Sequence, residues 1–363
     1  MKILYIIHSL TIGGAETIVT NYLIQLKRAG QDVVLLQMFD ENTFLNERLR
    51  QEKVRVVTAC TGDRNSFFGR IATIRNFRKL IGKENPDLIH VHTGLEKFRY
   101  LKYPAERIVF TVHSEWKRCV DKGKNHRKML FALIKQGMSV IVLSEKARQD
   151  VLEQFPDAKV HYIPNGLDFE KIRAGRYDRE EFLKSLNIPA TGFILGHVGR
   201  FHQVKNHEKV LSVFRKVLEQ REDAHLLLVG SGNADEEDRM SRLIAESGIG
   251  ARIHVLGDRM DATAIMSVLD CFLLPSYSES FSLVLVEAQV LGIRCVVSAA
   301  VPEEVCCTAE CVRLSLKQTD DEWAACVLGD QTAETGNELS QFEIGEIMEH
   351  HLQLYGSLVS PER

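Results

Sequence analysis

Long apolar runs are missing from this sequence of 363 residues, although 45% of its residues are hydrophobic. No window reaches the roughly 18 uninterrupted apolar residues that a membrane-spanning helix needs. The apolar run from Met1 to His8 is too short for the core of a signal peptide, and no small-residue cleavage site follows it. We therefore expect a globular, cytoplasmic protein, and its length predicts two domains.

Cysteine is also scarce, and most of the eight cysteines lie within apolar, strand-like segments. Cys306, Cys307 and Cys311 form a cluster, but their spacing matches no zinc pattern and no histidine follows at ligand distance. A chain of this length needs no disulfide to hold its core together. These absences argue against a metal site and favour reduced thiols in a reducing cytoplasm.

Net charge is small, at −3, but the charges are unevenly distributed. Residues 1–180 contain 31 Lys and Arg against 21 Asp and Glu, whereas residues 181–363 contain 15 against 28. This change of sign supports a domain boundary near the middle of the chain. The basic half carries no nucleic-acid-binding motif, so a nucleic-acid partner is not expected.

In the first half, short apolar runs alternate with amphipathic stretches. Strands are expected at residues 2–8, 32–37, 54–57, 87–91, 108–113 and 139–143. Helices are expected after Gly13-Gly14-Ala15, around 68–81 and near 126–135. The alternation predicts βαβ units, in which helices cover both faces of a parallel sheet.

The alternation breaks at residues 163–168 and starts again in the second half. Strands are expected at 193–198, 225–229, 253–256, 271–274 and 295–297, and helices at 208–218 and 282–291. We predict an α/β protein of two doubly wound, Rossmann-like domains, 1–165 and 166–340, with a last helix within 341–363 that crosses back to the first. Two such domains in series would face a central cleft with the carboxyl ends of both sheets.

The most informative segment is the loop and helix that follow the strand expected at 271–274. Glu279 stands in the loop, and Glu287 stands about a turn and a half into the helix. The start of that helix offers free backbone N–H groups, which suit a diphosphate. Glu287 has apolar neighbours, and an unpaired carboxylate among them is costly, so we expect it to bind the ribose of a nucleotide. The alternative is an ordinary solvated residue.

Cations follow the first strand of the second half. Arg200 and Lys205 would offset the charge that develops when a sugar leaves its diphosphate, unless they are ordinary solvated loop residues. Gly13 and Gly14 allow a backbone to approach a ligand closely, although two glycines also make a tight turn. They are not the three-glycine fingerprint of nicotinamide-binding enzymes. His113 ends a strand, where an isolated histidine is more often structural.

These motifs occur in one order along nearly the whole chain. They are Gly13-Gly14-Ala15-Glu16, His113, Pro164-Asn165-Gly166-x-Asp168, Gly199-Arg200 with Lys205-Asn206, and the segment from Glu279 to Glu287. Together they resemble family 4 of the retaining glycosyltransferases, especially the bacterial exopolysaccharide and capsule enzymes. The resemblance implies a GT-B fold and transfer of a sugar from a nucleotide-sugar donor, with UDP as the first nucleotide to test, to a saccharide or lipid-linked acceptor.

The resemblance also implies roles for individual residues. The catalytic residues it implies are His113, Arg200, Lys205 and Glu279. The donor-binding residues it implies are Gly13, Gly14, Arg200, Lys205, Glu279, Ser280, Phe281, Ser282 and Glu287. Members of the family usually carry glycine beside the phenylalanine, whereas Ser280 and Ser282 flank Phe281 here. Backbone donors survive that change, but the preference for the donor sugar could shift.

Asn165 and Asp168 lie in the segment between the predicted domains, where an interdomain role and a simple turn with a helix cap are equally supported. The chain contains no Asp-x-Asp motif. That absence agrees with transfer without a metal, so no cofactor is expected.

Cations mix with aromatic residues in three stretches of the first domain. These are residues 97–103, 116–118 and 122–128. They form either a solvated face or a surface that docks on anionic lipid at the inner face of the cell membrane, near a lipid-linked acceptor. The positive first half favours docking.

Two other functions stay open. A non-hydrolysing nucleotide-sugar epimerase could use the same architecture, and it would form epimers without any acceptor. An inactive scaffold in a polysaccharide assembly complex would bind no nucleotide. Keeping Glu279, Glu287 and the two cations idle would be costly, which argues against the scaffold.

Overall fold

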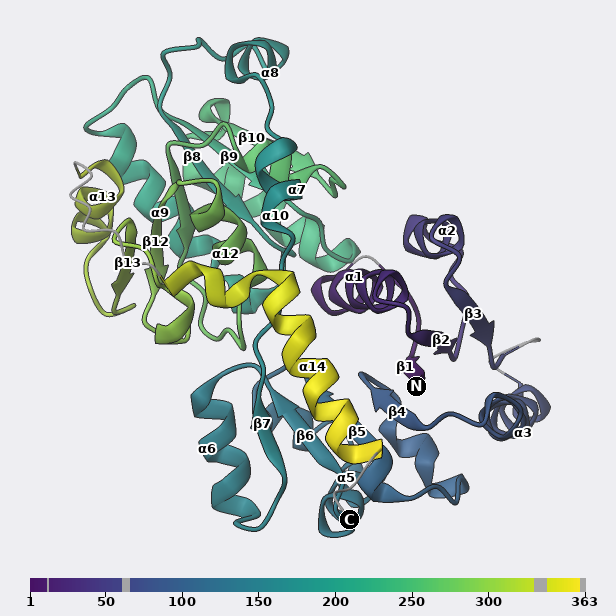
Figure 1. The fold of residues 1–363 in the computed structure, drawn as a ribbon. Helices are drawn as coiled ribbons and strands as arrows, with labels where there is room; N and C mark the ends of the chain where they lie inside the picture. Colours follow the sequence, from purple (N-terminus) through teal and green to yellow (C-terminus); the bar gives the residue numbers. More distant parts are fainter. Residues whose placement is uncertain (12, 61–65, 330–337, 360–363) are drawn as a thin grey trace. The chain divides into compact units, whose positions relative to one another are not determined.

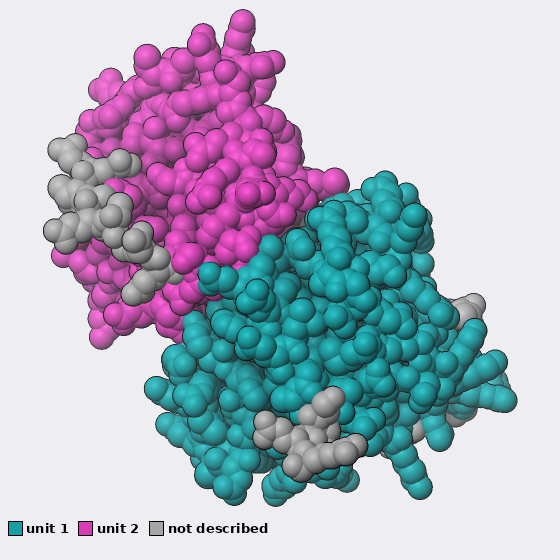
Figure 2. All heavy atoms as spheres, in the orientation of Figure 1, with its two compact units in different colours: residues 1–166, 344–363 teal, residues 167–343 magenta. Residues whose placement is uncertain are grey.

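The computed structural model of the chain describes residues 1–11, 13–60, 66–329 and 338–359. The chain folds into two compact units, coloured separately in Figure 2: unit 1 is Met1–Gly166 with Ile344–Arg363, and unit 2 is Leu167–Glu343. Each unit is a parallel β-sheet with helices between successive strands (Figure 1). The predicted α/β class and doubly wound sheets are therefore confirmed.

Unit 1 contains a seven-stranded sheet in the order β3-β2-β1-β4-β5-β6-β7. Its strands are β1 (Lys2–Ile7), β2 (Asp32–Gln37), β3 (Arg55–Thr58), β4 (Leu88–Val91), β5 (Ile108–Val112), β6 (Ser139–Val142) and β7 (Val160–Tyr162). Its helices are α1 (Gly14–Arg28), α2 (Phe44–Gln51), α3 (Phe67–Glu84), α4 (Trp116–Val120), α5 (Lys124–Lys135), α6 (Glu145–Gln154) and α14 (Ile344–Val359), with short 3₁₀ turns η1 (Leu95–Tyr100) and η2 (Ala105–Arg107). The central strands β1 and β5 are mostly apolar, and all their residues except Lys2 are buried, because helices cover both faces of the sheet.

Unit 2 contains a six-stranded sheet in the order β10-β9-β8-β11-β12-β13. Its strands are β8 (Ile194–Val198), β9 (His225–Val229), β10 (Ile253–Gly257), β11 (Cys271–Leu274), β12 (Arg294–Ser298) and β13 (Cys311–Leu314). Its helices are α7 (Phe169–Ala174), α8 (Arg179–Ser185), α9 (His207–Leu218), α10 (Ala234–Ser247), α11 (Ala262–Met266), α12 (Leu283–Val290) and α13 (Asp320–Leu328), with 3₁₀ turns η3 (Gln203–Lys205), η4 (Gly250–Arg252), η5 (Glu303–Val305) and η6 (Glu338–Phe342). The strands β7, β10 and β13 complete edges of the sheets, and of these the sequence had indicated only β10.

Both sheets reverse their strand order at one place. In unit 1, β1 pairs in parallel with both β2 and β4, and in unit 2, β8 pairs with both β9 and β11. In doubly wound sheets, ligands bind outside the carboxyl ends of the strands at such switch points. Each unit therefore has one position where a site is expected.

The last helix, α14, completes unit 1. Tyr355 on α14 shares hydrogen bonds with Tyr5 on β1, at 2.7 Å between hydroxyl oxygens, and with Nδ1 of His90 on β4, at 2.6 Å. Gly166 lies so close to α14 that a Cβ there would fall 2.9 Å from Cβ of Ile347. Its backbone N–H donates to the hydroxyl of Tyr22 at 2.8 Å. Only glycine fits this contact without displacing the helix.

Cysteines contribute a covalent link to unit 2. Cys306 and Cys311 form a disulfide, with Cα atoms 5.5 Å apart, which the expectation of reduced thiols did not include.

Within the described ranges, the helices of both units are too short or too polar to span a bilayer.

Candidate active site

The loops after β8 and β11 meet at the switch point of unit 2. Nζ of Lys205 lies 2.7 Å from Oε1 of Glu279, although the residues are 74 positions apart. The hydroxyl of Ser276 donates to the same carboxylate oxygen at 2.7 Å. The Lys205 and Glu279 side chains are 19% and 11% exposed, so the pair is largely shielded from solvent but still accessible to a ligand. Two of the predicted catalytic residues thus form one ion pair.

The loop after β8 is held in place by hydrogen bonds to the loop after β11. Asn206 adopts a left-handed conformation (φ +55°), caps α9, and donates from Nδ2 to the carbonyl of Pro275 at 3.1 Å. The N–H of Tyr277 donates to the carbonyl of Val204 at 2.8 Å. Lys205 therefore extends from a loop that the β11 loop holds in place, and its pairing with Glu279 follows from that arrangement.

Arg200 lies earlier in the same loop. Its neighbour Phe201 is buried, and the Phe201 N–H donates to the carbonyl of Ser231 at 2.9 Å, which anchors the backbone. The Arg200 side chain is exposed and makes no hydrogen bond or ion pair with any residue that the structure describes. This guanidinium is available to an anion.

The start of α12 departs from ordinary backbone geometry at Ser282. Its φ is +74°, in the left-handed region that favours glycine. Its hydroxyl is buried and has no hydrogen-bond partner among the described residues. Phe281 is buried against Phe342, with ring centroids 5.2 Å apart, so its side chain anchors the loop and only its backbone can face a ligand. Ser280 lies half-buried beside it. Backbone strain and a hydroxyl without a described partner therefore coincide at the amino end of α12, where an anion is expected.

Glu287 lies further along α12. Thr263 on α11 donates to its Oε2 at 3.1 Å. Burial raises the pKa of Glu287 to about 7, and the Thr263 hydrogen bond only partly opposes this shift. The carboxyl group is therefore poised to release a proton when hydroxyl donors arrive. It makes no contact with Glu279 or Lys205 among the described hydrogen bonds.

At the switch point of unit 1, two histidines pair. Nδ1 of His92, just after β4, lies 2.8 Å from Nε2 of His113, just after β5. Burial holds the pKa of His92 well below its usual value and lowers the pKa of His113 to about 4. Both imidazoles are therefore neutral at pH 7, and one must donate while the other accepts. Nε2 of His92 is buried without a partner among the described residues.

A cavity of about 610 Å³ opens beside His92. His8, Glu96, Lys122 and His126 also line it. His126, whose Nδ1 lies 3.8 Å from Oε2 of Glu96, lowers the pKa of Glu96 to about 2, so this carboxylate stays ionised. The cavity offers charged and neutral hydrogen-bonding groups at the carboxyl ends of β1 and β4.

The glycines after β1 begin α1. Gly13 is the N-cap in an extended conformation, and Gly14 is the first helical residue. The carboxylate of Glu16 folds back over this end of the helix, close to Gly13. It therefore lies where an anionic ligand would otherwise face the helix N-terminus.

The segment between the units gives two outcomes. Asp168 caps α7 by accepting from the N–H of Lys171 at 2.9 Å, so its helix-cap role is the one observed. Asn165 is buried in unit 1.

The predicted basic and aromatic surface of residues 97–103, 116–118 and 122–128 is wrong in part. Phe98 and Trp116 are buried at 3% and 5% exposure, and Trp116 donates from Nε1 to Gln154 at 3.0 Å. Their rings belong to the core of unit 1 because η1 and α4 pack onto the sheet. Cations such as Lys124 and Arg127 are exposed, whereas Tyr103 is half-buried and donates from its hydroxyl to the carbonyl of Pro86 at 2.9 Å.

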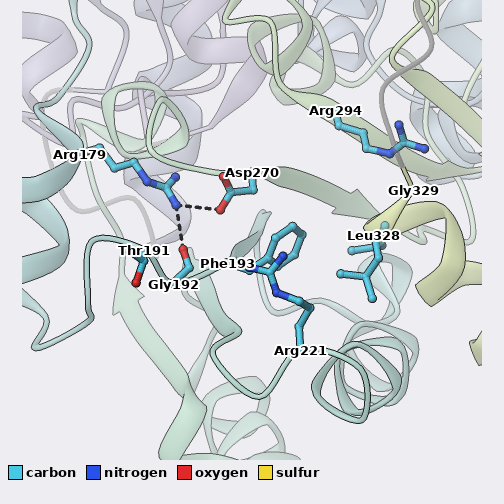
Figure 3. Close-up of a pocket in the computed structure, with 10 residues that line it drawn as sticks. Arg179, Thr191, Gly192, Phe193, Arg221, Asp270, Arg294, Leu328 and Gly329 are labelled. Atoms are coloured by element: carbon cyan, nitrogen blue, oxygen red, sulfur yellow. Dashed lines mark hydrogen bonds and ion pairs between the residues drawn. The ribbon is translucent and has the colours of Figure 1, made fainter.

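A second cavity, of about 320 Å³, lies in unit 2 (Figure 3). It is at the end of the sheet opposite the switch point. Arg179, Arg221 and Arg294 line it. Arg179 pairs with Asp270 at 2.8 Å, Arg221 with Asp223 at 2.9 Å, and Arg294 donates to the carbonyl of Cys326 at 2.7 Å. These guanidinium groups support the fold, and the cavity lies at the amino ends of the strands, away from the switch point.

Comparison with known proteins agrees with this geometry. Residues 12–171 match the model of Glycosyltransferase Family 4, and residues 178–325 match that of Glycosyl transferases group 1. The putative glycosyltransferase EpsF of Bacillus subtilis (strain 168) is 26% identical over 346 residues, covering 90% of this chain and 86% of that protein.

An Escherichia coli UDP-Gal:alpha-D-GlcNAc-diphosphoundecaprenol alpha-1,3-galactosyltransferase is 28% identical over 233 residues, covering 61% of this chain and 59% of that protein. The crystal structure of Anabaena Alr3699/HepE in complex with UDP and glucose superposes with a TM-score of 0.80 at 20% identity, covering 98% of this chain and 100% of that one. The fold is therefore GT-B, and the chain belongs to the glycosyltransferases, with a family 4 amino-terminal domain and a group 1 carboxy-terminal domain.

Proposed function

We propose that the protein transfers a sugar from a UDP-sugar to a saccharide acceptor carried on a lipid, with retention of anomeric configuration and without a metal ion. The observation that carries this proposal is the Lys205–Glu279 pair at the switch point of unit 2. Two similar proteins support the choice of substrates. The Anabaena protein was crystallised in complex with UDP and glucose, and the name of the Escherichia coli relative includes a UDP-sugar and a lipid diphosphate acceptor.

In this proposal, Arg200 and Lys205 bind the donor diphosphate and offset the charge that builds on it as the sugar leaves. Glu279 keeps Lys205 extended and accepts hydrogen bonds from the sugar hydroxyls. Glu287 accepts hydrogen bonds from the ribose. No nucleophile is paired with a base among the described residues of this site, so the acceptor hydroxyl attacks on the face that the diphosphate leaves, and a phosphate oxygen takes its proton.

Unit 1 supplies the other half of the proposal. His113 contacts the donor sugar, as the family resemblance implies, and His92 holds it in one tautomer. The cavity beside His92 takes the acceptor saccharide, because its carboxylate, ammonium and imidazole groups can bind several hydroxyls.

The test is incubation of the whole chain with UDP-, GDP- and ADP-sugars, each with and without a saccharide-diphosphate-lipid acceptor. We expect transfer from a UDP-sugar only when the acceptor is present, an unchanged anomeric configuration by NMR, and full activity in EDTA. Epimerised donor without acceptor would replace the proposal by epimerase activity. A covalent sugar trapped on Glu279, or an inverted product, would overturn the mechanism. Absence of nucleotide binding in a thermal-shift screen would overturn the whole function.

A further inference from the structure

The segment between α7 and α8 contacts two helices of the candidate site. Arg176 donates from its guanidinium to the carbonyl of Leu291, which ends α12, at 3.0 Å. The backbone N–H of Tyr177 donates to the hydroxyl of Ser267, which ends α11, at 3.0 Å. The Tyr177 hydroxyl donates to the carboxylate of Asp261, which precedes α11. Two neighbouring residues therefore bond to α11 at both of its ends and to α12 at one.

Helix α11 needs such contacts because it is short. It has five residues, Ala262–Met266, whereas isolated helices of fewer than about 12 residues are marginal in water. Asp261 is itself oriented by the Arg259 guanidinium, with bonds of 2.7 and 2.6 Å to its two oxygens. The ring of Tyr177 stacks on Phe182, with centroids 5.2 Å apart. The Tyr177 hydroxyl thus joins a fixed ring to a fixed carboxylate, and it ties α11 to the rest of unit 2.

Thr263 is the residue through which α11 reaches the donor site. Its hydroxyl donates to Oε2 of Glu287 at 3.1 Å, and within the described ranges no other residue bonds to this carboxylate. Two causes set the pKa of Glu287, burial and the Thr263 hydrogen bond, and no charged group of the described elements around α12 shifts it. The orientation of Glu287 therefore depends on where α11 holds Thr263.

These contacts form one chain from Tyr177 through α11 to Glu287. If Tyr177 only capped a short helix, its loss would lower stability and leave the donor site unchanged. The far end of the chain, however, is a carboxylate whose one described partner sits on α11, so a displaced α11 changes the site directly. We propose that Tyr177 is a positioning residue, which holds α11 so that Thr263 orients Glu287 toward the ribose of the donor. This inference rests on the proposed function, which assigns the ribose to Glu287.

The first test is calorimetric titration of the full chain with UDP, which contains the ribose, over a range from about pH 6 to about pH 9. Thr263→Val removes the hydrogen bond that lowers the pKa of Glu287, so the pH midpoint of UDP affinity should rise by about one pH unit. At pH 7, binding should then be about fivefold weaker, because fewer Glu287 side chains are ionised. Thr263→Ser keeps the hydroxyl and should restore the wild-type profile.

The second test links Tyr177 to that contact. Tyr177→Phe keeps the ring on Phe182 and the backbone N–H, and it removes only the hydroxyl that bonds to Asp261. UDP binding at pH 7 should weaken about two- to threefold, with the pH midpoint displaced upward as in Thr263→Val. The double variant Tyr177→Phe/Thr263→Val should lose no more than Thr263→Val alone, because both changes act through one contact.

A matched control is Tyr103→Phe in unit 1, which also removes a single tyrosine hydroxyl. That hydroxyl donates to the carbonyl of Pro86 at 2.9 Å, far along the chain from the donor site. The control should leave UDP affinity and its pH midpoint unchanged. Turnover at saturating donor should stay near wild type in Tyr177→Phe, since the ribose is bound equally in the ground state and the transition state.

Three outcomes would overturn the inference. Thr263→Val could keep the wild-type pH profile, the losses in the double variant could add, or Tyr177→Phe could lower the melting temperature without changing UDP binding. Failure of the proposed function would look different. In that case the wild-type chain would bind no UDP, whereas UDP binding that Glu287→Gln weakens and Thr263→Val leaves unchanged would remove this inference alone.

Discussion

The two switch points share one strand arrangement but differ in the groups that occupy them. In unit 2, Lys205 and Glu279 form a partly exposed ion pair, and Arg200 is an exposed cation earlier in the loop that carries Lys205. In unit 1, His92 and His113 are neutral because burial lowers their pKa values. One scaffold thus places an ion pair at one switch point and a pair of neutral imidazoles at the other.

The net charges of the two units do not follow this division, because unit 2 is acidic overall and unit 1 is basic overall. Residues 167–343 contain 18 Lys and Arg against 29 Asp and Glu, whereas residues 1–166 and 344–363 contain 28 against 20. An anionic donor would therefore be repelled by unit 2 as a whole, so the proposed site depends on a few cations held in place. The proposal thus rests on local geometry and not on the net charge of the unit.

The largest expected effect is on the charged switch point. Lys205→Ala should reduce kcat by about a hundred- to a thousandfold, the cost of losing one preorganised group that stabilises developing charge. The matched control is Lys209→Ala, which removes an ion pair with Asp320 of 2.6 Å from the next helical turn. The control should stay near wild-type activity in a donor-saturated transfer assay. Equal losses in both variants, or a lower melting temperature with full turnover, would make Lys205 structural.

The second effect is on donor affinity and its pH dependence. Only ionised Glu287 accepts two ribose hydroxyls, so UDP-sugar affinity should rise about tenfold from pH 6 to pH 8, through the raised pKa of about 7. Glu287→Gln should weaken binding at least tenfold and flatten this profile in calorimetric titrations. A UDP-sugar titration that stays equally tight in the variant would remove the ribose assignment.

The same substitution should stabilise the protein without donor. The pKa of Glu287 is raised in the folded state, so folding takes up a proton, and the stability this gives is lost as pH rises from about 4.5 to about 7. At pH 8, the free energy of unfolding of Glu287→Gln should therefore exceed that of the wild type by about 2–3 kcal/mol, which a urea titration would show as a higher midpoint. An unchanged or lower midpoint would show that Glu287 carries no burial cost.

A smaller effect is expected at the neutral switch point. His92→Phe removes the hydrogen bond to His113 while keeping a ring that can stack on Tyr5, as His92 does at 5.1 Å. We expect kcat to fall about five- to tenfold with little change in donor KM. The wild-type kcat profile should show no group titrating near pH 6.5 from His113, because the pKa of His113 is about 4. A KM effect alone would make His92 a ligand-binding residue and not a positioning one.

The smallest effect concerns strain at α12. Ser282→Gly relieves a left-handed serine and removes an unpaired buried hydroxyl, so the free energy of unfolding should rise by about 1 kcal/mol. Donor affinity should fall a few-fold if that hydroxyl binds the diphosphate. Lys53→Gly, at φ +55° in unit 1, is the control: it should stabilise similarly and leave donor binding unchanged. Equal donor affinity in both variants would leave Ser282 with strain alone.

Periodicity was sufficient for the sheets except the edge strands β7 and β13, and for the strand and helix that flank Glu279 and carry Glu287, because βαβ units are local patterns of apolar residues. The contact between Lys205 and Glu279 was not predictable, since it depends on Asn206 and Tyr277 joining two loops across the sheet. The strain at Ser282 was also hidden, because only the backbone angles reveal it; the replacement of glycine by serine was the available signal.

The surface of unit 1 was not predictable from the sequence pattern. Residues 97–103 and 116–118 mix cations with aromatic residues in the sequence, but Phe98 and Trp116 are buried in the core because η1 and α4 pack onto the sheet. Helix α3 was indicated only as a helical stretch around 68–81, and its apolar outer face became visible when Phe77 and Ile81 were seen to fill the inner one. Which face of a helix packs inward is a tertiary property that spacing alone leaves undecided when both faces carry apolar residues.

The position of α14 has a consequence for biosynthesis. Tyr355 completes hydrogen bonds to Tyr5 and His90, residues that are made 350 and 265 positions earlier in translation. The amino-terminal unit therefore cannot finish its interior until α14 has left the ribosome, whereas unit 2 has all its strands earlier. A chain released before residue 344 would contain every element of unit 2 but would leave Tyr5 and His90 without their partner on α14, so only unit 1 would stay incomplete.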